Sequence, residues 1–350
     1  MATVADVAKH AGVSVSTAAR VLSGSGYASD DTRKIVLDAA RELGYVPNQI
    51  ARSLRTKQTR MLGLLIGDVE NSFYSMIAKN VESIAKASGY HVVLCNGDDD
   101  PAVEREYLKL IEGMRVDALI VTPTAKNRRH LARLLPSIVI VQVDRRVEGL
   151  DADAILVDNE AGAASAVTHL IEAGHTNIGI LTGNVELATA DQRLIGYKRA
   201  LKDHGIAVRP ALIRSGSFHR EHAIEDATAL IRAKPAPTAI FAANNILAEG
   251  TMVALGQLGL RVPRDMSLIG FDDEPWMSIV EPAITTVRQP VVDIARSAAE
   301  LALRRLRDGR DGGPSTVVFR TELVERGSVA SPRKVRAIKA DKATKTVSAR

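Results

Sequence analysis

Two parts of the sequence with different patterns meet at the stretch Val46-Pro47-Asn48-Gln49-Ile50-Ala51-Arg52-Ser53-Leu54-Arg55-Thr56. Pro47 cannot continue a preceding helix, but it suits the first turn of a new one. The residues after Pro47 predict a helix of about two turns, which is marginal by itself in water. We therefore expect residues 47–58 to form a hinge helix or linker that becomes ordered when it meets a partner.

The composition predicts a globular protein of two or three domains, because the chain has 350 residues, of which 46% are apolar and 3% aromatic. A single cysteine, Cys95, excludes an internal disulfide framework. The first residues do not have the pattern of a signal peptide, and no apolar run approaches the roughly 20 residues that span a bilayer. We expect a cytoplasmic protein with no membrane partner.

Charge is distributed unevenly along the sequence. Residues 1–60 hold nine Lys and Arg against five Asp and Glu, residues 331–350 hold seven against one, and the middle carries an acidic excess. A basic head on an acidic body is expected when the head meets a polyanion and the body does not. The tail, residues 331–350, predicts a disordered end that is either simply solvated or weakly attracted to phosphates.

The head, residues 1–46, predicts three short helices. Thr3 and Asp6 have the spacing of a capping box, and a first helix is expected from Val4 to Ala11. Gly12 supplies a turn, Ser14 caps a second helix over 15–22, and a third is expected over 32–43. Three helices with a tight turn between the first two indicate a helix-turn-helix unit. A small helical bundle used for protein contacts is the alternative that the helices alone leave open.

The second helix has one apolar and one polar face. Ala18, Val21 and Leu22 are expected to pack inward, whereas Val15, Ser16 and Arg20 project outward. Outward residues near the start of such a helix contact base edges in the major groove. Arg20 suits a guanine, Val15 a thymine methyl group, and Ser16 is permissive.

The body, residues 59–330, alternates short apolar runs with amphipathic segments, which predicts doubly wound parallel sheets in two lobes divided near 158–162. The predicted strands are Leu62–Ile66, His91–Asn96, Ala118–Thr122, Ile138–Val143, Ile178–Thr182, Ala239–Ala243 and Ser267–Phe271. The predicted helices are Tyr74–Ser88, Ala102–Met114, Glu160–Ala173, Arg193–His204, His222–Lys234 and Ala248–Leu258.

Polar residues follow several of these strands, at the edge where ligands of such sheets bind. They are Asp68–Tyr74, Asp144-Arg145, Asn244-Asn245 and Asp272-Asp273. Each one alone is more typical of a turn, because Asp and Asn are common turn residues. Their recurrence at the same sheet edge favours a binding site.

The head and the stretch that follows it contain a long ordered series of motifs: Asp6-Val7-Ala8, Ala11-Gly12-Val13-Ser14, Ser16-Thr17, Arg20-Val21-Leu22, Leu43-Gly44-Tyr45-Val46-Pro47-Asn48 and Ala51-Arg52-Ser53-Leu54. With these motifs the sequence resembles the lactose-repressor family of transcription factors. The resemblance implies a homodimer on a near-palindromic double-stranded DNA operator, with the residue matching Leu54 wedged into the minor groove. The DNA-contacting residues it implies are Thr3, Ser14, Val15, Ser16, Thr17, Arg20, Tyr27, Asn48, Ala51, Leu54 and Arg55. Ala18-Ala19 departs from the usual Val-Ser, which predicts a different operator.

The body resembles the same family and the periplasmic sugar-binding proteins. Its motifs are Val157-Asp158-Asn159-Glu160-Ala161-Gly162, Leu170-Ile171-Glu172-Ala173-Gly174-His175, Gly270-Phe271-Asp272-Asp273 and Thr285-Thr286-Val287-Arg288-Gln289-Pro290. The resemblance implies a two-lobed effector-binding and dimerisation core whose chain crosses back near 287–291 and 318–322. It implies the effector residues Asn71, Phe73, Tyr74, Asp144, Arg145, Arg193, Phe218, Asn244, Asp272 and Gln289, to which we add the nearby Trp276. The expected effector is ribose or a related monosaccharide, although Tyr74 replaces the usual phenylalanine.

Two other classes of protein fit the sequence less well. An enzyme on this fold is disfavoured because the chain lacks GxGxxG after a strand, GxxxxGK[ST], HExxH and GxSxG. A plain sugar-binding protein does not explain the head. The sequence therefore predicts a sugar-controlled transcription regulator, most simply a repressor, without catalytic residues, cofactor or metal. Whether the sugar releases the operator or strengthens its binding stays open.

Overall fold

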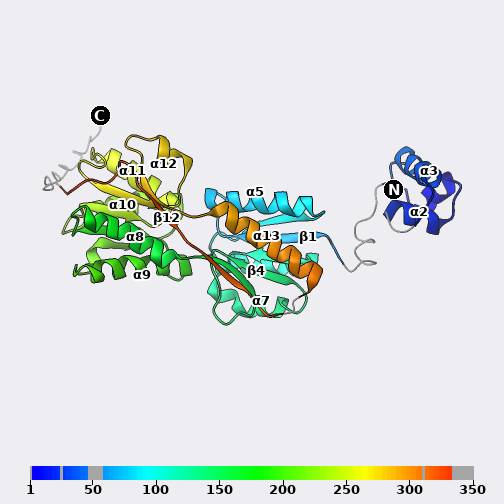
Figure 1. Ribbon diagram of the computed structural model, residues 1–350, viewed down its shortest axis with the longest axis horizontal. Helices are drawn as coiled ribbons and strands as arrows, with labels where there is room; N and C mark the ends of the chain where they lie inside the picture. The colour runs from blue at the N-terminus through cyan, green and yellow to red at the C-terminus, as the bar shows by residue number, and fades with distance from the viewer. Residues whose placement is uncertain (1, 24–26, 46–57, 310–311, 333–350) are drawn as a thin grey trace, which may run out of the picture. The chain divides into compact units, whose positions relative to one another are not determined.

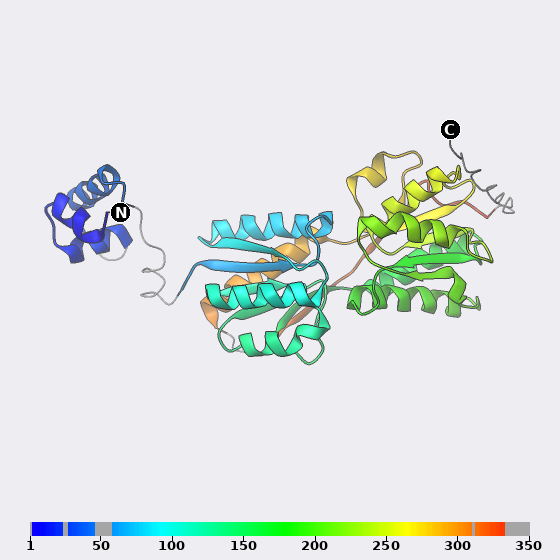
Figure 2. The same cartoon turned by 180° about the vertical axis from the view of Figure 1, so that it is seen from behind.

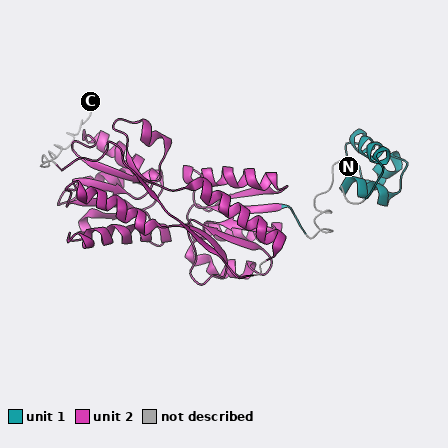
Figure 3. Cartoon of the chain, viewed as in Figure 1, with its two compact units in different colours: residues 1–60 teal, residues 61–350 magenta. Residues whose placement is uncertain are grey.

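A computed structural model gives the structure of residues 2–23, 27–45, 58–309 and 312–332. The chain divides into two units, residues 1–60 and residues 61–350 (Figure 3). Most of the predicted hinge, and residues 333–350 of the predicted tail, lie outside the described residues. No described helix is both long and apolar enough to cross a membrane.

The first unit consists of α1 (Val4–His10), α2 (Val15–Ser23) and α3 (Asp30–Glu42), as predicted. The capping box of α1 is present, because the Thr3 backbone N–H donates to Asp6 Oδ2 at 2.8 Å and the Asp6 N–H donates to Thr3 Oγ1 at 3.3 Å. Gly12 turns the chain with a φ of 64°. The core of this unit consists of Val7, Ala8, Ala18, Val21, Val36, Ala39 and Ala40.

The second unit contains, within its described residues, two six-stranded sheets, one in each lobe (Figure 1). Lobe 1 has the order β11-β5-β4-β3-β1-β2, and all its strands are parallel. Its strands are β1 (Met61–Ile66), β2 (His91–Asn96), β3 (Ala118–Val121), β4 (Val139–Val143), β5 (Asp153–Val157) and β11 (Thr316–Phe319). The predicted fold class, a helix-turn-helix unit with a two-lobed parallel α/β body, is confirmed.

Lobe 2 has the order β12-β10-β9-β8-β6-β7, and β12 is antiparallel to β10. Its strands are β6 (Ile178–Thr182), β7 (Ile213–Ser215), β8 (Ala239–Ala242), β9 (Ser267–Phe271), β10 (Thr285–Arg288) and β12 (Glu322–Val324). Seven of the twelve described strands in the two sheets were predicted. The strands β5, β7, β10, β11 and β12 were not.

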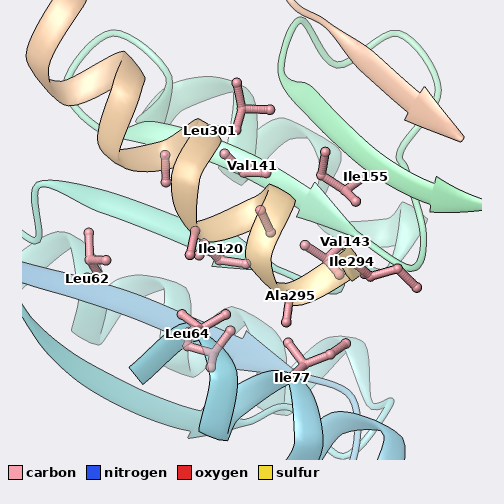
Figure 4. Packing of buried hydrophobic residues seen from close by; sticks show 14 of the residues in the cluster. Leu62, Leu64, Ile77, Ile120, Val141, Val143, Ile155, Ile294, Ala295 and Leu301 are labelled. Atoms are coloured by element: carbon pink, nitrogen blue, oxygen red, sulfur yellow. The ribbon is translucent and has the colours of Figure 1, made fainter. Parts of the chain in front are cut away.

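Helices cover both faces of each sheet (Figures 1 and 2). In lobe 1, α5 (Ser72–Ala87) and α13 (Val291–Asp308) share one apolar cluster with the sheet, shown in Figure 4. The helices α6 (Pro101–Met114) and α7 (Arg128–Leu134) share another cluster on the opposite face. In lobe 2 the first face carries α8 (Asn159–Glu172) and α9 (Ala188–Asp203), and the second carries α10 (Arg220–Ile231), α11 (Asn245–Gln257) and α12 (Pro275–Ile279). Short 3-10 turns lie at η1 (Ala125–Asn127) and η2 (Pro210–Leu212).

Three segments connect the lobes. The chain leaves lobe 1 between β5 and α8, returns between β10 and α13, and leaves again between β11 and β12 (Figure 1). Because α13 closes the apolar core of lobe 1 although it follows lobe 2 in the sequence, neither lobe is a continuous segment of chain. This topology makes the lobes separate rigid bodies joined by short connections, which is the usual basis of hinge motion.

Candidate functional site

The outward face of α2 is the candidate surface for reading DNA. Val15 is 53% exposed, and Ser16 and Arg20 are exposed, whereas Ala18 and Val21 are buried. Ser14 Oγ accepts the Thr17 backbone N–H at 3.1 Å and so caps the helix. The predicted inward and outward faces of α2 are therefore correct, except that Leu22 is only half-buried.

The other predicted DNA-contacting residues are distributed as follows. Thr3 caps α1, and Tyr27 is 90% exposed between α2 and α3. Of the two residues that depart from the family pattern, Ala18 is buried and Ala19 is exposed next to Arg20 on the outward face. The residues Asn48, Ala51, Leu54 and Arg55 lie outside the described residues.

A second candidate site is a polar cavity between the two lobes. Its volume is about 20 Å³, which is the space of roughly one water molecule, so a monosaccharide does not fit the cavity in this arrangement of the lobes. The residues that line it are Asp68, Asn71, Phe73, Tyr74, Asp99, Asp144, Thr189, Arg193, Phe218, Asn244 and Gln289. Eight of the eleven predicted effector residues are therefore brought together here.

The side of the cavity formed by lobe 1 is built on the first turn of α5. Asn71 caps this helix by accepting the Phe73 N–H at 3.0 Å, which places Phe73 and Tyr74 at the cavity. The Tyr74 hydroxyl donates to Asp144 Oδ2 at 3.0 Å and accepts from Arg145 Nη2 at 3.0 Å. Burial raises the pKa of the Asp144 carboxyl group, because the charged form loses its hydration.

Arg145 lies behind this wall and pairs with Asp99. Burial by itself lowers the pKa of Arg145, but the neighbouring Asp99, Tyr74 and Asp144 raise it above its ordinary value. The guanidinium group is therefore charged, and it stabilises the carboxylates on the lobe 1 side.

The side formed by lobe 2 is organised by Arg193 of α9. Its Nη1 donates to the Ala243 carbonyl at 2.6 Å, its Nε donates to Asn159 Oδ1 at 2.9 Å, and its guanidinium carbon lies 3.7 Å from the centre of the Phe271 ring. Burial raises the pKa of Asp272, which accepts a hydrogen bond of 2.5 Å from Gln289 Nε2. Arg193 is thus fixed in place by Asn159, the Ala243 carbonyl and the Phe271 ring.

Asp144 and Asp272 occupy equivalent positions in the two lobes. Each follows a buried strand, β4 or β9, and each has a positive φ, 66° and 72°. This conformation is costly for a residue other than glycine and persists where the surrounding structure imposes it, most often at functional sites. The matching backbone geometry supports a ligand that is held from both lobes.

Direct contacts across the cleft hold the lobes together. Asn245 Nδ2 donates to Asn71 Oδ1 at 3.1 Å, and Ser72 donates to Glu274. Lys126 of lobe 1 pairs with Glu186 of lobe 2 at 2.7 Å. The structure therefore describes the closed arrangement of the lobes.

Three predicted effector residues do not line the cavity. Arg145 and Asp272 lie directly behind it and contact lining residues. Trp276 is different: it lies in α12 and packs against an apolar cluster of lobe 2, because a large ring gains more from that cluster than from a polar cleft. Trp276 is thus not part of the cavity as described.

Asp99 and Thr189 line the cavity although we did not select them from the sequence, and Asp68 lines it from the polar segment Asp68–Tyr74, without having been predicted as an effector residue. Asp99 follows β2 at the same sheet edge as the predicted residues, so the rule that selected Asp144 also fits Asp99. Thr189 lies four residues before Arg193 on α9, on the same helix face. Asp68 belongs to the loop that contains Asn71.

A helix-turn-helix unit joined to a two-lobed body with a polar cavity between the lobes defines a DNA-binding regulator controlled by a small ligand. The family model for bacterial regulatory proteins of the lacI family matches residues 3–48, and the model for periplasmic binding protein-like domains matches residues 167–329. The chain belongs to the lacI family. It is accordingly a transcriptional repressor with an effector-binding body, not an enzyme.

Individual relatives cover nearly the whole chain. A "Ribose operon repressor" from Halalkalibacterium halodurans is 36% identical over 87% of this chain and 91% of its own length. The repressor PurR from Aliivibrio salmonicida is 34% identical over 88% of this chain and 93% of its own length. A solved Lac repressor dimer bound to operator is 26% identical, with a TM-score of 0.82 over 94% of this chain and 99% of that chain.

Proposed function

We propose that this repressor binds a near-palindromic operator as a homodimer and is released from it by a neutral sugar, ribose or a related monosaccharide. The observation that carries the sugar assignment is the cavity, in which carboxylate, amide and guanidinium groups from both lobes surround a small space beside two phenylalanines. Carboxylates and amides bind paired hydroxyl groups, and aromatic faces cover the C–H side of a sugar ring. The ribose operon repressor among the relatives supports the same ligand class.

The charges of the cavity favour a neutral ligand over a sugar phosphate. Among the described residues that line it or lie directly behind it, the carboxylates of Asp68, Asp99, Asp144 and Asp272 outnumber the guanidinium groups of Arg145 and Arg193. Burial raises the pKa of Asp68, Asp144 and Asp272, so each of these carboxylates gains from a hydroxyl donor. A phosphate group would instead add negative charge where it is already in excess.

Titration calorimetry on the full chain tests this ligand class. We expect ribose to bind, and ribose 5-phosphate to bind at least about tenfold more weakly, because like charges in a buried site cost several kcal/mol. Free nucleobases serve as the comparison, since they can stack on Phe73 and Phe218 but offer no row of hydroxyl groups. Tighter binding of the phosphate or of a nucleobase than of any monosaccharide would refute the assignment.

The dimer and its operator are proposed on two grounds. A single small head makes few base contacts, and helix-turn-helix proteins reach useful affinity by placing two heads on two half-sites. The Lac repressor to which this chain is similar is a dimer on its operator. On the outward face of α2, Val15, Ser16 and Arg20 are the residues we propose to read bases.

The control of DNA binding is a linkage between two sites. If the sugar stabilises an arrangement of the lobes in which the two heads cannot both reach their half-sites, then the sugar weakens operator binding and the operator weakens sugar binding by the same factor. The same architecture also allows the opposite linkage, in which the ligand strengthens operator binding. A titration of operator with and without saturating sugar distinguishes the two.

A further inference from the structure

Four polar residues form a hydrogen-bonded group across the cleft, which we call the cross-lobe cluster. Lobe 1 contributes Asn71 and Ser72 at the start of α5, and lobe 2 contributes Asn245 at the start of α11 and Glu274 just before α12. Asn245 Nδ2 donates to Asn71 Oδ1 at 3.1 Å and lies 3.0 Å from Ser72 Oγ. The Ser72 hydroxyl donates to Glu274. The two lobes are thus joined by direct side-chain contacts.

The contacts of the cluster differ in strength. Asn245 is only 5% exposed, and its Oδ1 is buried without a hydrogen-bond partner, which offsets part of what its Nδ2 contributes. The Ser72 hydroxyl donates to a carboxylate, and hydrogen bonds to charged groups are the stronger kind. The cross-lobe pair of Lys126 and Glu186 is more than half exposed on both sides and contributes little. We therefore expect Ser72 to contribute most to holding the lobes together.

The side chains that line the cavity are held by contacts within their own lobes. In lobe 1, the Tyr74 hydroxyl donates to Asp144 at 3.0 Å. In lobe 2, the Asn244 side chain caps α11, and the Phe218 ring lies so close to Gly183 that a Cβ atom there would be 2.6 Å from it. Because these side chains are fixed, space for a larger ligand is gained most readily by separation of the lobes.

We propose that the cross-lobe cluster is an autoinhibitory contact, which holds the lobes in an arrangement that excludes the sugar and so competes with it. The cavity measures about 20 Å³ when the cluster is formed. Separation of the lobes enlarges the cavity and moves Asn71 away from Asn245, and Ser72 away from Glu274. The observed affinity for sugar is then the intrinsic affinity reduced by the fraction of protein in which the cluster is open. This inference rests on the proposed function, since it concerns how the same cavity admits its sugar.

Titration calorimetry with ribose tests the proposal on the full chain, by comparing the unaltered protein with Ser72→Ala and Asn245→Ala. Neither side chain lines the cavity, so neither variant loses a residue of the cavity wall. Each variant removes hydrogen bonds from the cluster, and we expect each to bind ribose about three- to tenfold more tightly than the unaltered protein. The proposal is overturned if neither variant binds ribose more tightly.

Ser75→Ala is the matched control. Ser75 lies on the same helix, and its hydroxyl donates to the Val69 carbonyl at 2.7 Å, so this variant loses a hydrogen bond inside lobe 1 and none across the cleft. We expect its affinity for ribose to equal that of the unaltered protein. A gain in Ser75→Ala as large as that in Ser72→Ala would overturn the role of the cross-lobe contacts. Thermal unfolding reports whether each variant is folded.

The separation of the lobes tests the cluster without a sugar. Pulsed EPR measures it between nitroxide labels at Glu106, exposed on α6 of lobe 1, and Lys198, exposed on α9 of lobe 2. We expect Ser72→Ala and Asn245→Ala to add a population with more widely separated lobes, and an unchanged separation in both would overturn the proposal. Wider separation in the variants, together with failure of every monosaccharide to bind, would overturn the proposed sugar and leave the role of the cluster in closing the cavity standing.

Discussion

Replacing Arg193 with alanine is expected to weaken ribose binding by at least about a hundredfold, which corresponds to the loss of a hydrogen-bonded charge in a buried site. Burial lowers the pKa of Arg193, and the charges of Asp272 and Asp144 act in the opposite direction. Without Arg193, two buried carboxylates lose their shared positive neighbour. The Arg193→Ala variant should also remain bound to its operator when ribose is added.

Two controls separate ligand binding from folding. Arg193→Lys keeps the positive charge but cannot make both side-chain hydrogen bonds of Arg193, to Asn159 and to the Ala243 carbonyl, so its loss of affinity should be smaller than that of the alanine variant. Arg199→Ala removes an arginine from the same helix that is 45% exposed and pairs with Glu160, and it should change ribose affinity little. Ribose binding by a folded Arg193→Ala protein with unchanged affinity would exclude Arg193 from the site.

Replacing Arg20 with alanine is expected to weaken binding to the specific operator by about tenfold to a hundredfold, with a much smaller loss on random DNA. A bidentate contact from arginine to guanine contributes about 1–3 kcal/mol of discrimination between bases. Arg20 is exposed on the outward face of α2, with its Nε 3.4 Å from the Ser16 carbonyl, so its guanidinium group can reach outward. Competition binding at one fixed salt concentration measures both affinities.

Lys34→Ala is the matched control for charge, because Lys34 is an exposed cation of the same unit, on α3. Loss of Lys34 should lower the affinity for operator and for random DNA alike, or change neither. If Arg20→Ala causes equal losses on the two kinds of DNA, Arg20 holds phosphates and does not read a base.

The elements that the sequence predicted are those with an unambiguous period and clear ends. The strand β2 has the predicted bounds His91–Asn96, and α6 begins one residue before the predicted start, at a proline that suits a first helical turn. The strand β11 was missed because it is short and exposed, with Val318 at 55% exposure, and so presents no buried apolar run. The helix α13 buries mainly alanines against α5, and alanine is equally common on exposed helix faces.

The features of the cavity also divide into those that the sequence could predict and those that it could not. Asp144 and Asp272 were predictable, because each follows a strand at the ligand-binding edge of its sheet. Their positive φ values, and the hydrogen bond from the Tyr74 hydroxyl to Asp144, depend on atoms brought together from distant parts of the chain. Trp276 was misplaced because proximity in sequence to Asp272 does not determine which way a helix such as α12 turns its ring.

A titration of labelled operator, followed by fluorescence anisotropy, tests most directly whether the cavity and the head are coupled. Operator affinity is measured without sugar and at saturating concentrations of the pentose that binds most tightly, and sugar affinity is then measured with and without saturating operator. We predict that the sugar weakens operator binding and that operator weakens sugar binding by the same factor. Operator affinity that stays the same, or becomes stronger, when the sugar site is saturated would contradict release by a sugar.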